Sequence, residues 1–358
     1  MRIGLFGFPG TGKSTLFSLL TGAPPPHAGA REEARIGVAR VPDPRLDRLS
    51  AMYRPKKTTP ATVEYVDLQG VGKGEAADAL PLDQLRVADA LAHVVRGFRD
   101  EAVPHVEGPV DPARDVATME TELILADHTI AERRIEKLDL AVRKAHRDED
   151  RKELELLRKC LRALEREVPL RDLEFSEEES KRLRGFTFLS LKPLLVVVNA
   201  DEADAPLRAG GAPSFGLEAA AARPATEIVC LSAKIEAEIA ELEPEEARAF
   251  RADLGIREPA LERMIRASYR LLGRISFFTV GDDECRAWTI RRGTHARPAA
   301  GTVHSDIERG FIRAELVAYD DLVAAGTWAA CRDRGTLRLE GKDYVVRDGD
   351  VINFRFGV

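Results

Sequence analysis

The sequence predicts an α/β protein with a mostly parallel sheet, a helical hairpin inserted into the sheet domain, and a small β-rich domain after it. Three observations predict this architecture. A glycine-rich run, GFPGTGKS at 7–14, stands between a short apolar run and a second, partly apolar stretch. Two highly charged stretches between positions 131 and 168 carry apolar residues at heptad spacing. Positions 275–358 hold short runs of β-branched and aromatic residues broken by Gly and Asp.

Length and composition bound the kind of protein. With 358 residues the chain is too long for one ordinary core and suits two or three domains. Its 44% apolar and 32% charged residues are typical of a soluble globular protein, and no run approaches the roughly 20 apolar residues of a membrane helix. The N-terminal apolar run breaks at Pro9-Gly10, which argues against a signal peptide. A net charge of −6 argues against a surface that coats nucleic acid broadly.

The cysteines indicate a reducing compartment. They are scattered, with no C-x-x-C pair and no His at zinc-ligand spacing: Cys160, Cys230, Cys285 and Cys331. We expect reduced thiols in a cytoplasmic protein, without structural zinc and without a membrane partner.

The run at 7–14 fits the phosphate-loop pattern G-x-x-x-x-G-K-[ST], with Gly7, Gly12, Lys13 and Ser14 at the fixed positions. The preceding RIGLF suits a buried parallel strand, and KSTLFSLLTG suits a first helix that ends at Gly22. Strand, loop and helix in this order are the context that the motif requires. The sequence therefore predicts nucleotide binding here.

The residue types of this loop account for the expected chemistry. Glycines let the backbone N–H groups turn toward phosphate, and the helix N-terminus adds partial positive charge. Lys13 would reach the β- and γ-phosphates and stabilise charge during hydrolysis, while Ser14 would ligate Mg²⁺. The expected nucleotide-binding residues of the loop are Gly10, Thr11, Gly12, Lys13, Ser14 and Thr15.

A carboxylate is also needed to hold the magnesium shell. The extended run TVEYVDLQG (62–70) ends at Asp67 and has Gly70 in D-x-x-G spacing. We expect Asp67 to serve the metal, and the backbone N–H of Gly70 to meet the γ-phosphate.

Two further strands end in candidate base-reading residues. LLVVVNADE (194–202) ends in Asn199, Ala200, Asp201 and Glu202, and TEIVCLSAK (226–234) ends in Ser232, Ala233 and Lys234. G-type NTPases carry N-K-x-D and S-A-K at these places, and the Asp accepts both guanine donors. Glu202 displaces that carboxylate by one methylene, which predicts a weakened guanine preference and makes ATP plausible. One alternative stays open, because a slipped loop could recruit Asp201 and restore GTP.

The charged stretches in the middle of the chain predict an antiparallel helical hairpin. Two heptad seams carry it: Ala131, Ile135, Leu138, Val142 and Ala145, then Leu154, Leu157, Leu161, Leu164 and Val168. HRDEDRK (146–152) separates them and could reverse the chain. The dense charge fits a solvated face, and an RNA-binding face on the other side of the hairpin is compatible with it.

The last part of the chain predicts a small mixed sheet. FFTVG, RAWTI and DYVVRDGDVINFRF read as short strands, with RDGDV as a tight turn before the final one. A β-grasp domain fits this pattern.

These residues, with longer stretches, resemble the YchF family of Obg-like ATPases. The matching stretches include VPDPRLDRL (41–49), EYVDLQG (64–70), HVVRGF (93–98), LKPLLVVVNADE (191–202), positions 286–322 and positions 338–358. The resemblance implies a G domain (1–111 and 191–274), a coiled-coil insertion (112–190) and a TGS-type β-grasp domain (275–358). It also implies ATP and GTP binding with ATP favoured, slow hydrolysis, and association with ribosomes or ribosomal RNA. We expect a monomeric cytoplasmic protein that uses Mg²⁺, and whether K⁺ assists stays open.

The sequence departs from the family where hydrolysis and switching would occur. Counting back from VPDPRLD places Arg31 where the family has a metal-binding Thr, and Ala30 where it has a Cys. Switch II is shortened, and Val71 stands where Ras-like enzymes place a water-orienting Gln. His105 matches a His proposed to act catalytically in relatives, and a structural role is its alternative. Arg31 could act as an arginine finger in cis or remain a solvated charge.

Two functions follow. The first is a slow ATPase whose nucleotide state controls association with the translation machinery. The second is a nucleotide-gated binding module that does not hydrolyse, because its switch regions are altered. A small-molecule kinase fits worst, since no lid-like arginine cluster is present.

Overall fold

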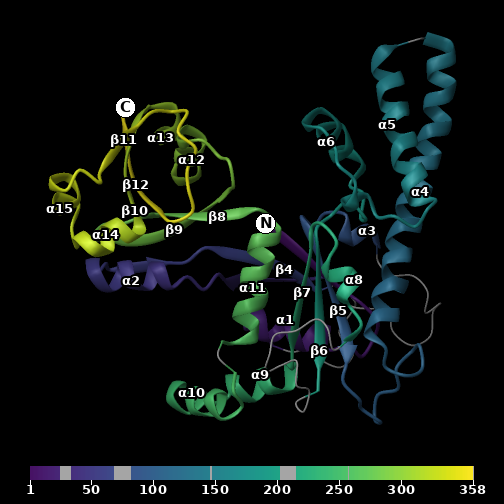
Figure 1. Cartoon of the computed structure of the whole chain (residues 1–358), viewed down its shortest axis with the longest axis horizontal. Helices are drawn as coiled ribbons and strands as arrows, with labels where there is room; N and C mark the ends of the chain where they lie inside the picture. The colour runs from purple at the N-terminus through teal and green to yellow at the C-terminus, as the bar shows by residue number, and fades with distance from the viewer. Residues whose placement is uncertain (25–33, 68–81, 146, 202–214, 257, 358) are drawn as a thin grey trace. The chain divides into compact units, whose positions relative to one another are not determined.

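The computed structural model describes residues 1–24, 34–67, 82–145, 147–201, 215–256 and 258–357 (Figure 1). Its contacts group into two compact units. The first unit combines Met1–Gly37 with Glu64–Ala267, and the second combines Val38–Val63 with Ser268–Val358. The four-part division expected from the sequence stays a prediction. The contacts group the hairpin with the first unit and add 38–63 to the C-terminal segment.

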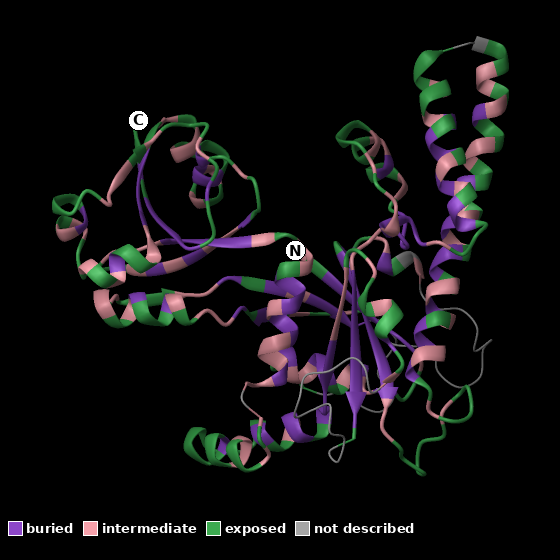
Figure 2. Ribbon diagram, viewed as in Figure 1, coloured by how far each residue is buried: buried purple, intermediate pink, exposed green. Residues whose placement is uncertain are grey.

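The first unit holds most of a six-stranded sheet of order β2-β4-β1-β5-β6-β7, and parts of β2 and β4 are grouped with the second unit. The strands are β1 (Arg2–Phe6), β2 (Arg35–Arg40), β4 (Thr62–Asp67), β5 (Ala90–Gly97), β6 (Leu194–Ala200) and β7 (Thr226–Leu231). The ladders from β4 through β7 are all parallel. All of β6 and nearly all of β5 are buried, as Figure 2 shows. Continuous apolar runs such as LLVVV form such strands because helices cover both faces of the sheet.

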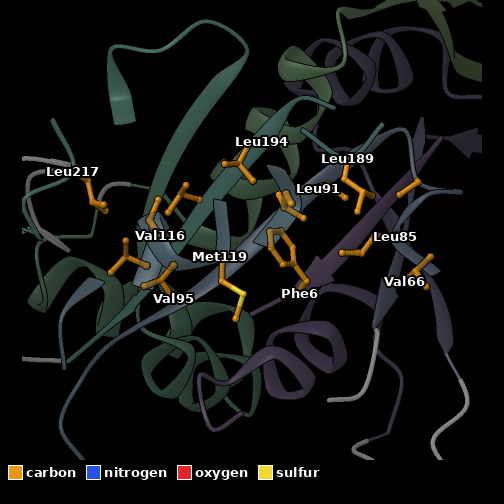
Figure 3. Close-up of a cluster of buried hydrophobic side chains, with 14 of the residues drawn as sticks. Phe6, Val66, Leu85, Leu91, Val95, Val116, Met119, Leu189, Leu194 and Leu217 are labelled. Atoms are coloured by element: carbon orange, nitrogen blue, oxygen red, sulfur yellow. The ribbon is translucent and has the colours of Figure 1, made fainter. Parts of the chain in front are cut away.

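Helices complete the first unit. They are α1 (Lys13–Thr21), α3 (Leu82–Leu85), α8 (Glu218–Ala221), α9 (Ala233–Ala240), α10 (Pro244–Asp253) and α11 (Ala260–Leu271), whose last residues extend into the second unit. One sheet face packs against the start of α4 (Pro112–Ala145), where Phe6, Val95, Val116 and Met119 belong to one buried cluster (Figure 3). This cluster fixes the first turns of α4 to the sheet.

The helical hairpin consists of α4 and α5 (Asp148–Leu164), which lie side by side in Figure 1. The expected seam residues are buried or half-buried, except Ala145, whose side chain lies outside the described residues. The reversal is shorter than HRDEDRK predicted, because α5 already begins at Asp148. Three acidic residues, Asp148 to Asp150, occupy its first turn, where negative charge stabilises a helix N-terminus.

The heptad pattern did not predict a second buried face of α5. Leu156, Cys160 and Ala163 are buried although they lie outside the seam. The segment after the helix packs in the same cluster and includes η1 (Leu170–Asp172), α6 (Glu177–Leu183) and η2 (Arg184–Phe186). A two-in-seven seam accounts for contact with one partner helix, whereas α5 has a second partner.

The second unit contains a mixed sheet of order β11-β10-β12-β8-β9-β3. The strands are β3 (Lys57–Thr59), β8 (Arg274–Thr279), β9 (Glu284–Arg291), β10 (Phe311–Ala318), β11 (Arg338–Glu340) and β12 (Asp350–Phe356). Its helices are α2 (Pro44–Tyr53), α12 (Ala296–Val303), α13 (Ser305–Arg309), α14 (Tyr319–Ala325) and α15 (Trp328–Asp333). The expected turn before the last strand is present, and Gly349 takes φ 90° there. The α/β fold class with a small mixed C-terminal sheet is confirmed.

No helix in the described part of the chain combines the length and the apolar composition that crossing a bilayer requires.

Candidate functional site

The candidate site lies at one edge of the first unit's sheet. Because the strands from β4 to β7 are parallel, their carboxyl ends meet at that edge. The glycine-rich loop follows β1, Asp67 ends β4, Asn199 lies near the end of β6, and Ser232 follows β7. The sheet therefore gathers four motifs that are far apart in the sequence.

Two glycines of the loop have conformations and contacts that only glycine permits. Gly7 has φ 140°, and a Cβ there would lie 2.3 Å from the Val94 carbonyl oxygen. Gly12 has φ 92°, and a Cβ there would lie 2.5 Å from Nδ2 of Asn199. The loop backbone thus passes close to β5 and β6 because these side chains are absent.

The helix N-terminus behind the loop offers unsatisfied donors. Leu16 N–H donates the first intrahelical hydrogen bond, to Gly12 O at 2.9 Å. The N–H groups of Lys13, Ser14 and Thr15 therefore have no acceptor within the helix. The first turn of α1 contains no acidic residue. Free donors and the helix dipole together favour an anion such as phosphate.

Lys13 is folded back into the loop. Its side chain is buried, and Nζ donates to Gly7 O at 3.0 Å and to Phe8 O at 2.7 Å. Burial lowers the pKa of Lys13 from 10.5 to about 8, and the charge of Asp67 partly opposes this shift. The ammonium group is therefore poorly compensated until an anion arrives.

Asp67 is a buried carboxylate beside the Ser14 hydroxyl. It is fully buried, and neither of its oxygens has a hydrogen-bond partner among the described residues. Burial raises its pKa, while Ser14, Lys13 and Arg35 act in the opposite direction. An ionised carboxylate in such a place calls for a cation, and a hydroxyl beside a carboxylate is an oxygen set that suits Mg²⁺. Ser14 and Asp67 therefore fit the expected metal.

Asn199 joins two loops. Its Nδ2 donates to Thr11 O at 3.0 Å, and its Oδ1 accepts from Ala233 N–H at 2.9 Å. The side chain is buried, so both bonds are made away from water. Asn199 therefore fixes the phosphate loop to the loop that follows β7.

The remaining base-side residues are placed in part. Ser232 caps α9 by accepting from Ile235 N–H at 3.3 Å, and Ala233 and Ala200 are buried. Asp201 is exposed. The residues Ala30, Arg31, Gly70, Val71 and Glu202 lie outside the described residues.

His105 lies beside the loop and is occupied by other partners. Its Nδ1 accepts from Glu107 N–H at 3.1 Å, and its Nε2 lies 2.9 Å from Asp115 Oδ2. Its ring meets Phe8 edge-on at 6.0 Å. Nδ1 is therefore engaged within the protein, whereas Nε2 forms no hydrogen bond among the described residues despite its approach to Asp115. A catalytic role would require His105 to leave Asp115, and it stays a prediction.

Comparison with known proteins agrees with this geometry. Residues 274–357 match the family YchF-GTPase_C, described as a protein of unknown function (DUF933). The ribosome-binding ATPase YchF of Bacillus subtilis is 43% identical over 370 aligned positions that span 100% of each chain. The chain belongs to the YchF family. Its namesake in Escherichia coli O157:H7 is 40% identical over 365 positions, covering 100% of this chain and 99% of that one. The solved structure of the Schizosaccharomyces pombe YchF GTPase has a TM-score of 0.86 and 31% identity, covering 99% and 97% of the two chains.

Membership of the YchF family confirms the resemblance found in the sequence. It does not reveal three residues that sequence analysis missed near the loop: Arg35, His93 and Arg96. Arg35 lies 4.8 Å over the Phe17 ring, and its Nη1 is buried without a hydrogen-bond partner among the described residues. His93 stacks on Phe6 at 4.7 Å, and burial lowers its pKa to about 3. The quoted stretch HVVRGF contained two of them, but only their burial beside the loop distinguishes them.

The lowered pKa of Lys13 predicts that proton uptake on nucleotide binding depends on pH. Bound phosphates would raise that pKa, so binding at pH 9 should take up about one proton per nucleotide, and binding at pH 6.5 about none from Lys13. Calorimetric titration with an ATP analogue and Mg²⁺, in buffers of different ionisation enthalpy, measures the uptake. Equal proton uptake at both pH values would contradict the prediction.

Proposed function

We propose that this chain binds ATP, with GTP as a weaker ligand, and hydrolyses it slowly in association with ribosomes. One observation carries the proposal. A buried lysine of lowered pKa and a buried carboxylate beside the Ser14 hydroxyl flank a helix N-terminus with free N–H groups. This arrangement is complementary to a nucleoside triphosphate with its divalent cation.

The residues of the chain would divide the work. Lys13 would exchange its carbonyl partners Gly7 and Phe8 for the β- and γ-phosphates. Ser14 and Asp67 would hold a magnesium ion, which neutralises phosphate charge when bound. The loop N–H groups would stabilise charge that develops on the phosphoryl oxygens. The His105 ring contacts Phe8 in the loop. If His105 moved away from Asp115, it could orient a water molecule at the outer side of the loop.

The names of relatives support the ribosomal part of the proposal. The Bacillus subtilis and Escherichia coli relatives are named ribosome-binding ATPases, and the Schizosaccharomyces pombe structure is named a GTPase. ATP is proposed as the preferred ligand because Glu202 replaces the Asp that reads guanine. A ribosomal particle is proposed as the partner because relatives carry the name ribosome-binding ATPase.

Calorimetric titration of the purified chain with ATP, a non-hydrolysable ATP analogue and GTP, each with Mg²⁺, tests the proposal. ATP should bind more tightly than GTP, and phosphate release should be slow but measurable with ribosomes and potassium present. Tighter GTP binding would mean that Asp201 or another group reads the base. Tight binding without any phosphate release would instead favour a non-hydrolysing, nucleotide-gated module.

Replacing Asp67 should remove the response to magnesium. In Asp67→Asn the ATP affinity should no longer rise when Mg²⁺ is added, and turnover should fall by about 100-fold or more. The ligand-free melting temperature should rise, because a buried carboxylate of raised pKa is neutralised. Calorimetry with and without Mg²⁺, and thermal unfolding, measure these effects.

Asp127→Asn is the matched control. Asp127 is as buried as Asp67, but it accepts from Leu189 N–H at 2.9 Å and from Ser190 N–H at 2.7 Å. Its replacement should lower the melting temperature and leave the magnesium response intact. A magnesium response retained in Asp67→Asn would remove Asp67 from the metal site.

A further inference from the structure

Arg96 is the largest fully buried side chain of the described residues. It lies on β5, one residue before the strand ends, and is 1% exposed. It pairs in register with Asn199 on β6, so it lies on the sheet face that carries the phosphate loop. Among the described residues, no carboxylate lies within ion-pairing distance of its guanidinium group. A buried cation without a counter-charge costs stability, and an anionic ligand nearby would reduce that cost.

The guanidinium group organises the segment that follows β5. Nε donates to Phe98 O at 3.1 Å, Nη2 to Asp100 O at 3.0 Å, and Nη1 to Val103 O at 2.7 Å. The group also lies 4.6 Å over the Phe98 ring. We call residues 98–105 the covering segment. Three divergent hydrogen bonds from one planar fork hold it, and a lysine could not make them all.

The covering segment lies against the phosphate loop. A Cβ built on Gly10 would lie 3.0 Å from Val103 Cγ1 and 3.8 Å from Arg96 Nη1. At the other end of the segment, His105 meets Phe8 edge-on. The segment therefore lies against the loop at two positions, and the hydrogen bonds of Arg96 hold the segment there.

The charges around the loop also favour a phosphate ligand. Lys13 and Arg96 are both buried cations, His93 beside Lys13 is neutral because its pKa is about 3, and Asp67 is the nearby carboxylate. Lys13 acts on Asp67, whereas the hydrogen bonds of Arg96 all go to backbone carbonyls. The excess of positive charge is complementary to a phosphate chain.

We propose that Arg96 is a positioning residue for nucleotide binding. It holds the covering segment so that Val103 fixes Gly10, and the loop N–H groups thereby stay aimed at the phosphates before the ligand arrives. This inference rests on the proposed function, because it assigns a further residue to the same site. Preorganised donors bind more tightly because the ligand does not have to order them.

The test compares the full-length chain with Arg96→Lys and Arg96→Gln. The dissociation constant for the non-hydrolysable ATP analogue with Mg²⁺ should rise about tenfold or more in both variants. The melting temperature of each ligand-free variant is measured beside it. Arg171→Lys is the control. Arg171 is also buried, and its Nη1 donates to the Ser190 carbonyl at 3.3 Å, but neither residue contacts the phosphate loop in the described part of the chain. It should lower the melting temperature without changing the dissociation constant.

Val103→Ala provides a second variant that keeps Arg96 and changes a half-exposed side chain. It should raise the same dissociation constant several-fold, and the double variant Arg96→Lys/Val103→Ala should bind no more weakly than Arg96→Lys, because both act through Gly10. Unchanged binding in the Arg96 variants beside a binding wild type would overturn the inference alone. Additive losses in the double variant would also overturn it. A wild type that binds no nucleotide would overturn the proposed function and this inference together.

Discussion

Lys13→Met should abolish nucleotide binding and leave the ligand-free protein at least as stable as the wild type. The ammonium group is buried, and its pKa is lowered to about 8, so the fold carries its charge at a cost near neutral pH. Methionine keeps the length and apolar stem of the side chain while removing that charge. Nucleotide binding should weaken by about 100-fold or more, because the phosphates lose their buried cationic partner.

Thermal unfolding with and without the ATP analogue measures both effects in one experiment. The wild type should gain melting temperature with ligand, and Lys13→Met should not. Lys192→Met is a matched control, because Lys192 is a half-buried lysine whose Nζ donates to two backbone carbonyls, of Arg86 and Ala88. It should keep the full ligand response. A ligand-dependent shift that survives in Lys13→Met would mean that the loop does not bind the phosphates.

Asn199→Ala should lower stability and weaken nucleotide binding together. It leaves Thr11 O and Ala233 N–H without partners in a buried place, at about 1–3 kcal/mol for each group. The melting temperature should fall by several degrees. The phosphate loop and the residues after β7 should no longer be held together by the Asn199 side chain. We expect the dissociation constant for ATP to rise by about tenfold or more.

Asn353→Ala controls for the same chemical change at an exposed position of β12. It should shift neither the melting temperature nor the dissociation constant appreciably. Asn199→Asp separates the two bonds, since Asp keeps the acceptor for Ala233 N–H and loses the donor to Thr11 O. If Asn199→Ala binds ATP as the wild type does, the link between the two loops is dispensable for binding.

Local patterns predicted the parts of this protein that local physics determines. The strand–loop–helix unit around Lys13 was predicted because glycine positions and apolar runs fix it within a few residues. The same holds for β6 and for the turn at Gly349 before β12. Each of these depends on neighbours in sequence, and each agrees with the structure.

The features that sequence analysis missed depend on how the chain folds. Arg96 is distinguished by its burial and by its hydrogen bonds to the carbonyls of Phe98, Asp100 and Val103, and His93 by its burial against Phe6. The second buried face of α5 depends on a segment that follows the helix. Strand β3 has only three residues, without a recognisable alternation, and its partner β9 is more than 200 residues away. No periodicity in the sequence records contacts of this kind.

The pairing of β3 with β9 has a consequence for folding during synthesis. Thr59 and its partner Glu284 are 225 residues apart, so at about 5–20 residues per second the first strand waits roughly 10–45 s for the second to be synthesised. During that interval strands β4 to β7 are synthesised, so every strand of the first unit's sheet is present before β9. Strand β3 spends this time without its partner β9. Its shortness and the adjacent charges of Lys56 and Lys57 are the features by which a strand edge avoids pairing with the wrong chain.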